Sequence, residues 1–122
     1  MNIGILGENI AFRYLLSNGY KVILRNYREG FDEIDIIGID PFDRLIFFEV
    51  KSRVIKNKNF ICFSPEDNFS FSKIKRIVRA CERFVAKHPF LIKDDFGWQI
   101  DLIAISLKGF YSYDLRHYKN CV

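Results

Sequence analysis

Two adjacent apolar runs limit most strongly what this chain can fold into. Residues 33–39 are rich in isoleucine and end at Asp40-Pro41, and residues 45–53 begin a second apolar run after a short turn. Such runs between turn residues predict two neighbouring strands, paired as a hairpin. Because apolar residues this dense suit strands covered on both faces, we expect an α/β protein with a central sheet flanked by helices.

Acidic residues interrupt both apolar runs. Asp35 lies in the first run and Glu49 in the second, where an unpaired buried charge would be very costly. Side chains alternate along a strand, so Glu49 and Lys51 point to one side, and a hairpin can place Asp35 opposite them. The sequence thus predicts two carboxylates and an ammonium group at one point, with the Val50 carbonyl between them.

The predicted donors are oxygens, which suit Mg²⁺ or Mn²⁺ far better than zinc. Such an ion binds a phosphate oxygen and lowers the pKa of a coordinated water. Lys51 would hold or deprotonate that water, and its neighbour Glu49 favours the holding role. Short motifs also arise by chance, so these residues have an alternative interpretation without a metal. In it, Lys51 and Glu49 form a structural ion pair and Asp35 caps a turn.

The remaining periodicity predicts two helices and three more strands. Glu8 falls in the opening turn of the first predicted helix, where the helix dipole stabilises a carboxylate without any metal. The second predicted helix can be capped by Ser72. The helices are expected over residues 8–18 and 72–87, and the strands over residues 21–27, 98–106 and 110–118.

One face of the second predicted helix is basic. Six cations lie on this helix and Glu82 is its only acid, a pattern that predicts contact with a phosphate backbone, although solvated charged faces are common. Two further arginines lie beside the predicted strands. The predicted nucleic-acid contacts are Arg28, Arg53, Lys73, Arg76, Arg79 and Arg83.

Seven pieces in one order resemble the YraN family of small bacterial proteins, which is related to Holliday-junction resolvases. The pieces are Gly7-Glu8-x-x-Ala11, Tyr14-Leu15, Gly19-Tyr20, Leu24-Arg25-Asn26-Tyr27-Arg28, Glu33-Ile34-Asp35-Ile36-Ile37, Phe48-Glu49-Val50-Lys51-x-Arg53 and Lys73. The resemblance implies a restriction-endonuclease-like αβββαβ core of the PD-(D/E)XK superfamily. It also implies an active-site set of Glu8, Asp35, Glu49 and Lys51, with Glu33 as a further acid close by.

The chain departs from the family pattern at three places, one of which is the stretch after the third strand, where Phe63-Ser64-Pro65-Glu66-Asp67-Asn68 stands for the usual Phe-Gly-x-Pro-x-Glu-Ala. Asp32 replaces the glycine that usually precedes Glu-Ile-Asp, and Gln99-Ile100-Asp101 replaces Arg-Phe-Asp. The acids and the lysine of the site are kept. The departures therefore concern substrate contact more than metal binding.

Composition is consistent with one domain over residues 1–122, because 49% of the 122 residues are hydrophobic and no linker or repeat divides them. The sequence has no run of 18 apolar residues, so we expect no membrane span. It shows no basic leader with a cleavage site, so we do not expect secretion. Cys62, Cys81 and Cys121 form no CxxC pair, which suits a reducing cytoplasm, and Cys81 is expected in the core.

These patterns favour a Mg²⁺-dependent endonuclease-like protein acting on DNA, with branched or damaged DNA as candidate substrates. A non-catalytic nucleic-acid-binding module on the same fold is the alternative, and an assembly protein that works through an edge strand is a third reading. The apolar C-terminal segment could pair with a second copy, so we also expect a homodimer.

Overall fold

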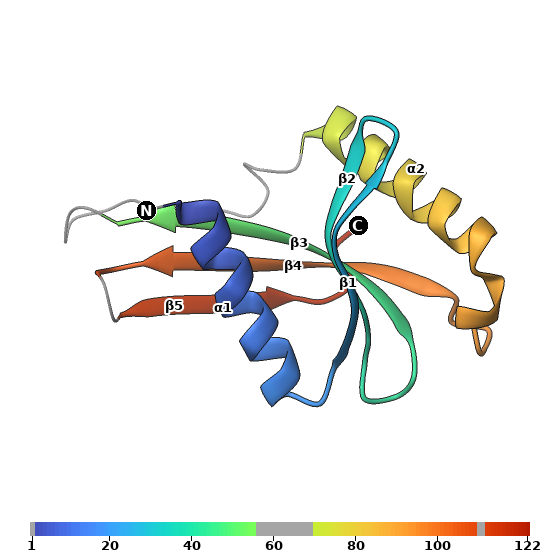
Figure 1. Cartoon of the computed structure of the whole chain (residues 1–122), viewed down its shortest axis with the longest axis horizontal. Coiled ribbons are helices and arrows are strands. Elements are labelled where there is room, and N and C mark those ends of the chain that lie inside the picture. Colours follow the sequence, from blue (N-terminus) through green and yellow to red (C-terminus); the bar gives the residue numbers. More distant parts are fainter. Residues whose placement is uncertain (1, 56–69, 110–111) are drawn as a thin grey trace.

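The computed structural model describes residues 2–55, 70–109 and 112–122, so Cys62 lies outside the described residues. The expected αβββαβ order is confirmed, and a fifth strand follows it (Figure 1). Within the described ranges, no helix is both long enough and apolar enough to cross a membrane. The elements are α1 (Ile3–Ser17), β1 (Lys21–Glu29), β2 (Asp32–Ile39), β3 (Leu45–Val54), α2 (Phe71–Lys87), the 3₁₀ turn η2 (Pro89–Leu91), β4 (Trp98–Leu107) and β5 (Tyr113–Tyr118).

The five strands form one mixed sheet in the order β1-β2-β3-β4-β5. β1, β2 and β3 are successively antiparallel, β3 and β4 are parallel, and β5 returns antiparallel to β4. Parallel neighbours need a crossover connection. The segment between β3 and β4 that contains α2 provides it.

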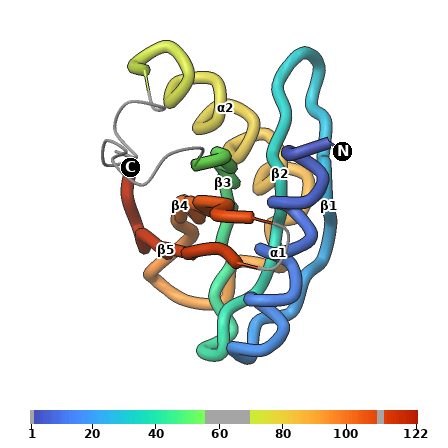
Figure 2. The backbone as a smooth tube through the Cα atoms, turned by 90° about the vertical axis from the view of Figure 1, so that its left-hand side faces the viewer, coloured from blue at the N-terminus to red at the C-terminus, as the bar shows by residue number. Residues whose placement is uncertain are grey.

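The two helices cover opposite faces of the sheet (Figure 2). Consecutive residues of β3 show this directly, because Phe48 packs in the core with α1 while Phe47 packs in the core with α2. Strands buried on both faces were expected from their continuous apolar runs, and this is confirmed. Cys81 is fully buried in the α2 core, also as expected.

Both helices begin earlier than the sequence predicts. α1 starts at Ile3, and Asn2 is its N-cap. The glycines at positions 4 and 7 have low helix propensity, so the sequence did not predict this first part of the helix, which tertiary packing stabilises. Glu8 therefore lies in the second turn, and the predicted position in the opening turn is wrong. The dipole effect fades within the first turn, so it does not account for Glu8. In α2 the cap is Ser70, whose side chain accepts a hydrogen bond from the Lys73 amide, and not Ser72.

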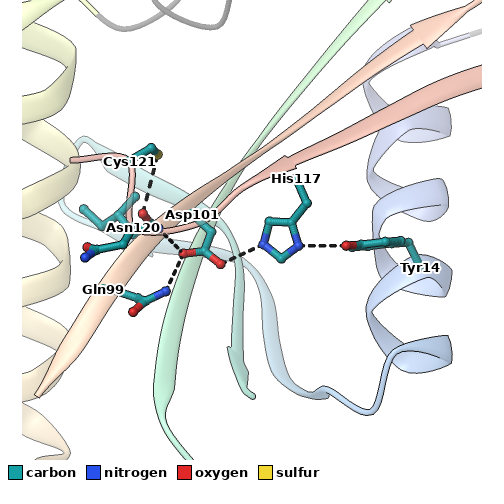
Figure 3. A network of polar contacts seen from close by, with 7 residues as sticks. Tyr14, Gln99, Asp101, His117, Asn120 and Cys121 are labelled. Atoms are coloured by element: carbon teal, nitrogen blue, oxygen red, sulfur yellow. Dashed lines mark hydrogen bonds and ion pairs between the residues drawn. The ribbon is translucent and has the colours of Figure 1, made fainter. Parts of the chain in front are cut away.

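A buried polar network ties α1 to the C-terminal part of the sheet (Figure 3). The two ring nitrogens of His117 bond to the Tyr14 hydroxyl at 2.8 Å and to the Asp101 carboxylate at 2.7 Å. Asp101 also accepts hydrogen bonds from the Gln99 side chain and the Asn120 amide, both at 2.9 Å. Asp101 is therefore a buried residue that holds several parts of this network together.

Candidate active site

The site lies where β2 and β3 separate. Their pairing runs from Ile39 opposite Leu45 to Ile36 opposite Phe48. Beyond that point β2 continues alongside β1, and β3 continues alongside β4 (Figure 1). Asp35 and Glu49 are the next residues of the two strands, so they face each other at the point of separation, which we call the fork.

At the fork, where the pairing of β2 with β3 ends, the side chain of Asp35 provides a hydrogen-bond acceptor for the backbone of β3. Its carboxylate accepts a hydrogen bond of 2.8 Å from the Val50 amide of β3. Burial and then the charge of Glu49 raise the pKa of Asp35 to about 8, while the Val50 amide opposes the rise. The alternative role of Asp35 as a turn cap is therefore wrong, because the residue lies inside β2 and bonds to β3.

Two lysines accompany Glu49. The Nζ atom of Lys73, on α2, lies 3.0 Å from a Glu49 oxygen. Lys51 lies close to the same groups, and its pKa is lowered first by burial and then by its polar contact with Lys73, whereas Glu49 and Asp35 raise it. Lys73 was expected to contact nucleic acid, and the structure places it inside the site. The structural ion pair of Glu49 is thus made with Lys73.

Glu8 approaches the same acids from α1. Gly7 makes this possible, because a Cβ atom there would lie 2.8 Å from Cβ of Ser52 and would collide with its hydroxyl. One Glu8 oxygen is buried and has no hydrogen-bond partner among the described residues. Burial raises the pKa of Glu8, Arg25 lowers it, and the charges of Glu33 and Glu49 raise it further.

Asn26 belongs to this environment although no chemistry was assigned to it from the sequence. It makes a polar contact with Glu8 and has a positive φ of 54° within β1. Non-glycine residues in this conformation cluster at functional sites. In the register of β1 and β2, Asn26 falls opposite Asp35, between the pairs Arg25–Ile36 and Tyr27–Ile34. The sequence feature that could have pointed to Asn26 is its place in the run Leu24-Arg25-Asn26-Tyr27-Arg28, which resembles the YraN family.

An open pocket of about 270 Å³ adjoins the fork on the side of α2. It combines carboxylates of β2 and β3 with cations of α2, a mixture suited to a metal and a phosphate. In the described ranges, no three His, Cys, Asp or Glu side chains converge as a ready metal-binding group. The pocket is lined by Phe31, Asp32, Glu33, Asp35, Glu49, Lys73, Arg76 and Ile77.

The remaining predicted basic contacts have different surroundings. Arg79 donates two hydrogen bonds, of 2.9 and 3.0 Å, to Asp32, and these bonds lower the Asp32 pKa. This pairing gives the buried Asp32 carboxylate a charged partner. Arg28 lies 3.5 Å from Glu33. Arg53 and Arg83 are exposed, on β3 beyond the fork and on α2.

Comparison with known proteins gives one family and several relatives. The profile described as "Uncharacterised protein family UPF0102" matches residues 7–105. A UPF0102 protein of Clostridium botulinum (strain 657) is 32% identical over 98% of this chain and 92% of its own length. One from Chlorobaculum tepidum is 34% identical over 96% of this chain and 88% of its own length.

Among solved structures, Pyrococcus furiosus SfsA in complex with Ca²⁺ is similar to this chain. The two share 18% sequence identity with a TM-score of 0.42. The match covers 95% of this chain and 62% of the SfsA chain.

Proposed function

We propose that this chain, which belongs to the uncharacterised protein family UPF0102, is a divalent-metal-dependent nuclease that hydrolyses phosphodiester bonds in DNA. The YraN family belongs to UPF0102, so the resemblance seen in the sequence is confirmed. The observation that carries the proposal is the fork, where two opposed carboxylates, Asp35 and Glu49, meet Lys51 and Lys73 beside an open pocket.

The donor set fits a hard divalent cation. Asp35, Glu49 and Glu8 would hold Mg²⁺ or Mn²⁺ through carboxylate oxygens, with the Val50 carbonyl as the further predicted ligand. Two observations support this fit: the orphaned buried oxygen of Glu8, and the high pKa of Asp35, which burial and then the nearby charge of Glu49 produce. When bound, the ion would neutralise charge on the phosphate and acidify a water molecule.

The chain's own side chains supply the remaining chemistry. Lys51 has a lowered pKa and lies beside the carboxylates, so its amine would orient the attacking water and stabilise developing negative charge. Lys73 neutralises Glu49 as the protein stands, and a cation at Glu49 would free it to contact a phosphate oxygen. Arg76 lines the same pocket and would contact the neighbouring phosphate.

A non-catalytic nucleic-acid-binding module is the second candidate. It is favoured by the Glu49–Lys73 ion pair and by the Asp35–Val50 hydrogen bond, because both carboxylates have partners without a metal. In this account the fork would be structural and the basic face of α2 would bind DNA alone. Activity and metal dependence distinguish the two candidates.

The test is cleavage of duplex, flapped and four-way DNA with Mg²⁺, with Mn²⁺ and with a chelator. We expect Asp35→Asn to abolish cleavage, since a metal ligand is lost, while DNA binding is kept, since the cations of α2 remain in place. Lys51→Ala should keep metal binding and lose rate. Asp43→Asn is the matched control, because Asp43 forms an exposed ion pair with Lys93 away from the fork. If the wild type cleaves none of these substrates, the binding module is the better account.

A further inference from the structure

Phe31 stands at the tip of the β1–β2 hairpin with its ring in solvent. The turn has only two residues, Gly30 and Phe31, between the paired Glu29 and Asp32. Gly30 has a φ of 64°, which matches the first position of a type II′ hairpin turn. Phe31 is 105% exposed relative to a free reference residue, so its whole ring is in water.

Phe31 differs from the other strongly exposed phenylalanines. Each of those packs against a cation or a ring: Phe42 and Phe96 with Arg44, Phe71 with Lys75, and Phe90 with His88. Within the described part of the chain, the Phe31 ring has no such partner. An aromatic ring without a partner on a stiff tip is costly to leave in water and available to an external ring.

The hairpin is held firmly against α2. Asp32 next to the tip bonds twice to Arg79, and Glu29 on the other side bonds to Lys87 at 2.9 Å. A platform fixed in advance loses little conformational freedom when it binds. The backbone of the hairpin tip is therefore held in one place beside α2, and Phe31 is not carried on a loose loop.

That place is the rim of the active-site pocket. Phe31 lines the same cavity as Asp35 and Glu49, and the cations Lys73 and Arg76 of α2 line it too. A nucleotide whose phosphate lies between the cations and the carboxylates has its base within one sugar of the phosphate. The exposed ring and the charged wall thus match the two halves of a nucleotide.

We propose that Phe31 stacks on an unpaired base beside the phosphate bound in this pocket, so that the preferred substrate is DNA with unpaired nucleotides, such as a flap or a branch. This inference rests on the proposed function, since it places the phosphate at the fork. Bases inside an intact duplex already stack on their neighbours, and freeing one costs energy. An unpaired base offers its face at no such cost.

The test measures binding in a chelator, so that no cleavage occurs. The probe is a flapped DNA with 2-aminopurine at the first unpaired position, compared with a blunt duplex of the same sequence. Phe31→Ala should weaken flap binding by about 5- to 150-fold, the range for loss of one base–aromatic stack, and duplex binding by less than about twofold. The quenching of 2-aminopurine by the wild type should disappear in Phe31→Ala and persist in Phe31→Trp.

Phe90→Ala is the matched control, because Phe90 is similarly exposed, at 71%, but lies in η2. The inference is overturned if Phe31→Ala and Phe90→Ala bind the flap equally well. It is also overturned if Phe31→Ala loses affinity equally for the flap and for the duplex. The two proposals fail separately. If the wild type cuts no DNA but Phe31→Ala loses the preference for the flap, the stacking site is supported and the nuclease assignment fails. If Phe31→Ala cuts DNA and keeps the preference for the flap, the nuclease assignment is supported and the stacking site fails.

Discussion

At the scale of the residue, Asp35 shows how the fold sets up the site's chemistry. Its carboxyl group is partly buried, faces Glu49 and receives a hydrogen bond from Val50. A pKa of about 8 means that the group is mostly protonated at neutral pH without metal, because burial disfavours its charged form and the charge of Glu49 adds to this effect. A divalent cation bound at the fork would reverse this preference, so metal binding would be coupled to proton release.

The first prediction concerns pH and stability in a chelator. The unfolded pKa of Asp is about 3.9 and the folded pKa of Asp35 is about 8. Between these two pKa values, Asp35 binds a proton in the folded state and not in the unfolded state. As the pH rises through this range, the contribution of Asp35 to the free energy of unfolding falls by up to about 1.4 kcal/mol per pH unit, and it levels off above the folded pKa. Thermal melts from pH 6 to 9 should show this fall in wild type and in Asp43→Asn, and a much flatter profile in Asp35→Asn. Parallel profiles for all three proteins would contradict a raised pKa at Asp35.

The sequence identified Asp35, Glu49 and Lys51 because charge inside an apolar strand is a local signal. It missed Lys73 as the partner of Glu49, since that contact depends on where α2 crosses the sheet. Asn26 was missed for a similar reason. Its left-handed backbone and its position opposite Asp35 follow from strand register, which no local pattern specifies.

At the scale of the element, the fork depends on close approach of α1 to β3. Gly7 packs against Ser52, and this contact brings the neighbouring Glu8 toward the two strands. The sequence could predict the strands and helices, because their apolar periodicity is strong. It could not predict the separation of β2 from β3, since both strands read as continuous apolar runs through that point.

The second prediction tests this helix–strand contact. Gly7→Ala gains up to about 1 kcal/mol of helix propensity, so a contact without steric conflict would stabilise the protein. We expect a lower melting temperature, because the new Cβ collides with Ser52. The double variant Gly7→Ala/Ser52→Gly should recover much of the loss relative to Ser52→Gly alone. Gly109→Ala is the control, because among the described residues, chain neighbours aside, no atom lies within 4 Å of the new Cβ. Additive effects of the two substitutions would show that the contact is not tight.

At the scale of the whole molecule, charge is unevenly distributed. The net charge is only +4, yet acids gather at the fork while the cations of α2 lie along one side of it. This arrangement suits a phosphate chain that crosses the acids while the cations hold it. The homodimer stays a prediction, to be tested by the mass from light scattering.

The third prediction is that DNA binding falls steeply with salt through α2. Each phosphate contact contributes about −0.9 to the slope of log affinity against log salt, so Arg76→Gln/Arg83→Gln should reduce its magnitude by about 1.8. Arg79 was expected to contribute equally, but its guanidinium is shared with Asp32, so Arg79→Gln should also loosen the hairpin. Lys93→Gln/Lys108→Gln removes the same charge from exposed ion pairs elsewhere. A slope unchanged by the α2 substitutions would exclude this face from the interface.

The central claim, that the carboxylates of the fork bind a divalent cation, is tested most directly by calorimetric titration with Mn²⁺ at pH 7 in two buffers of different ionisation enthalpy. We predict saturable binding by wild type and by Asp43→Asn, with a buffer-dependent heat that reports proton release from Asp35. Asp35→Asn and Glu49→Gln should lose most of this binding. Absence of Mn²⁺ binding by the wild type, or equal binding by all four proteins, would contradict a metal site at the fork.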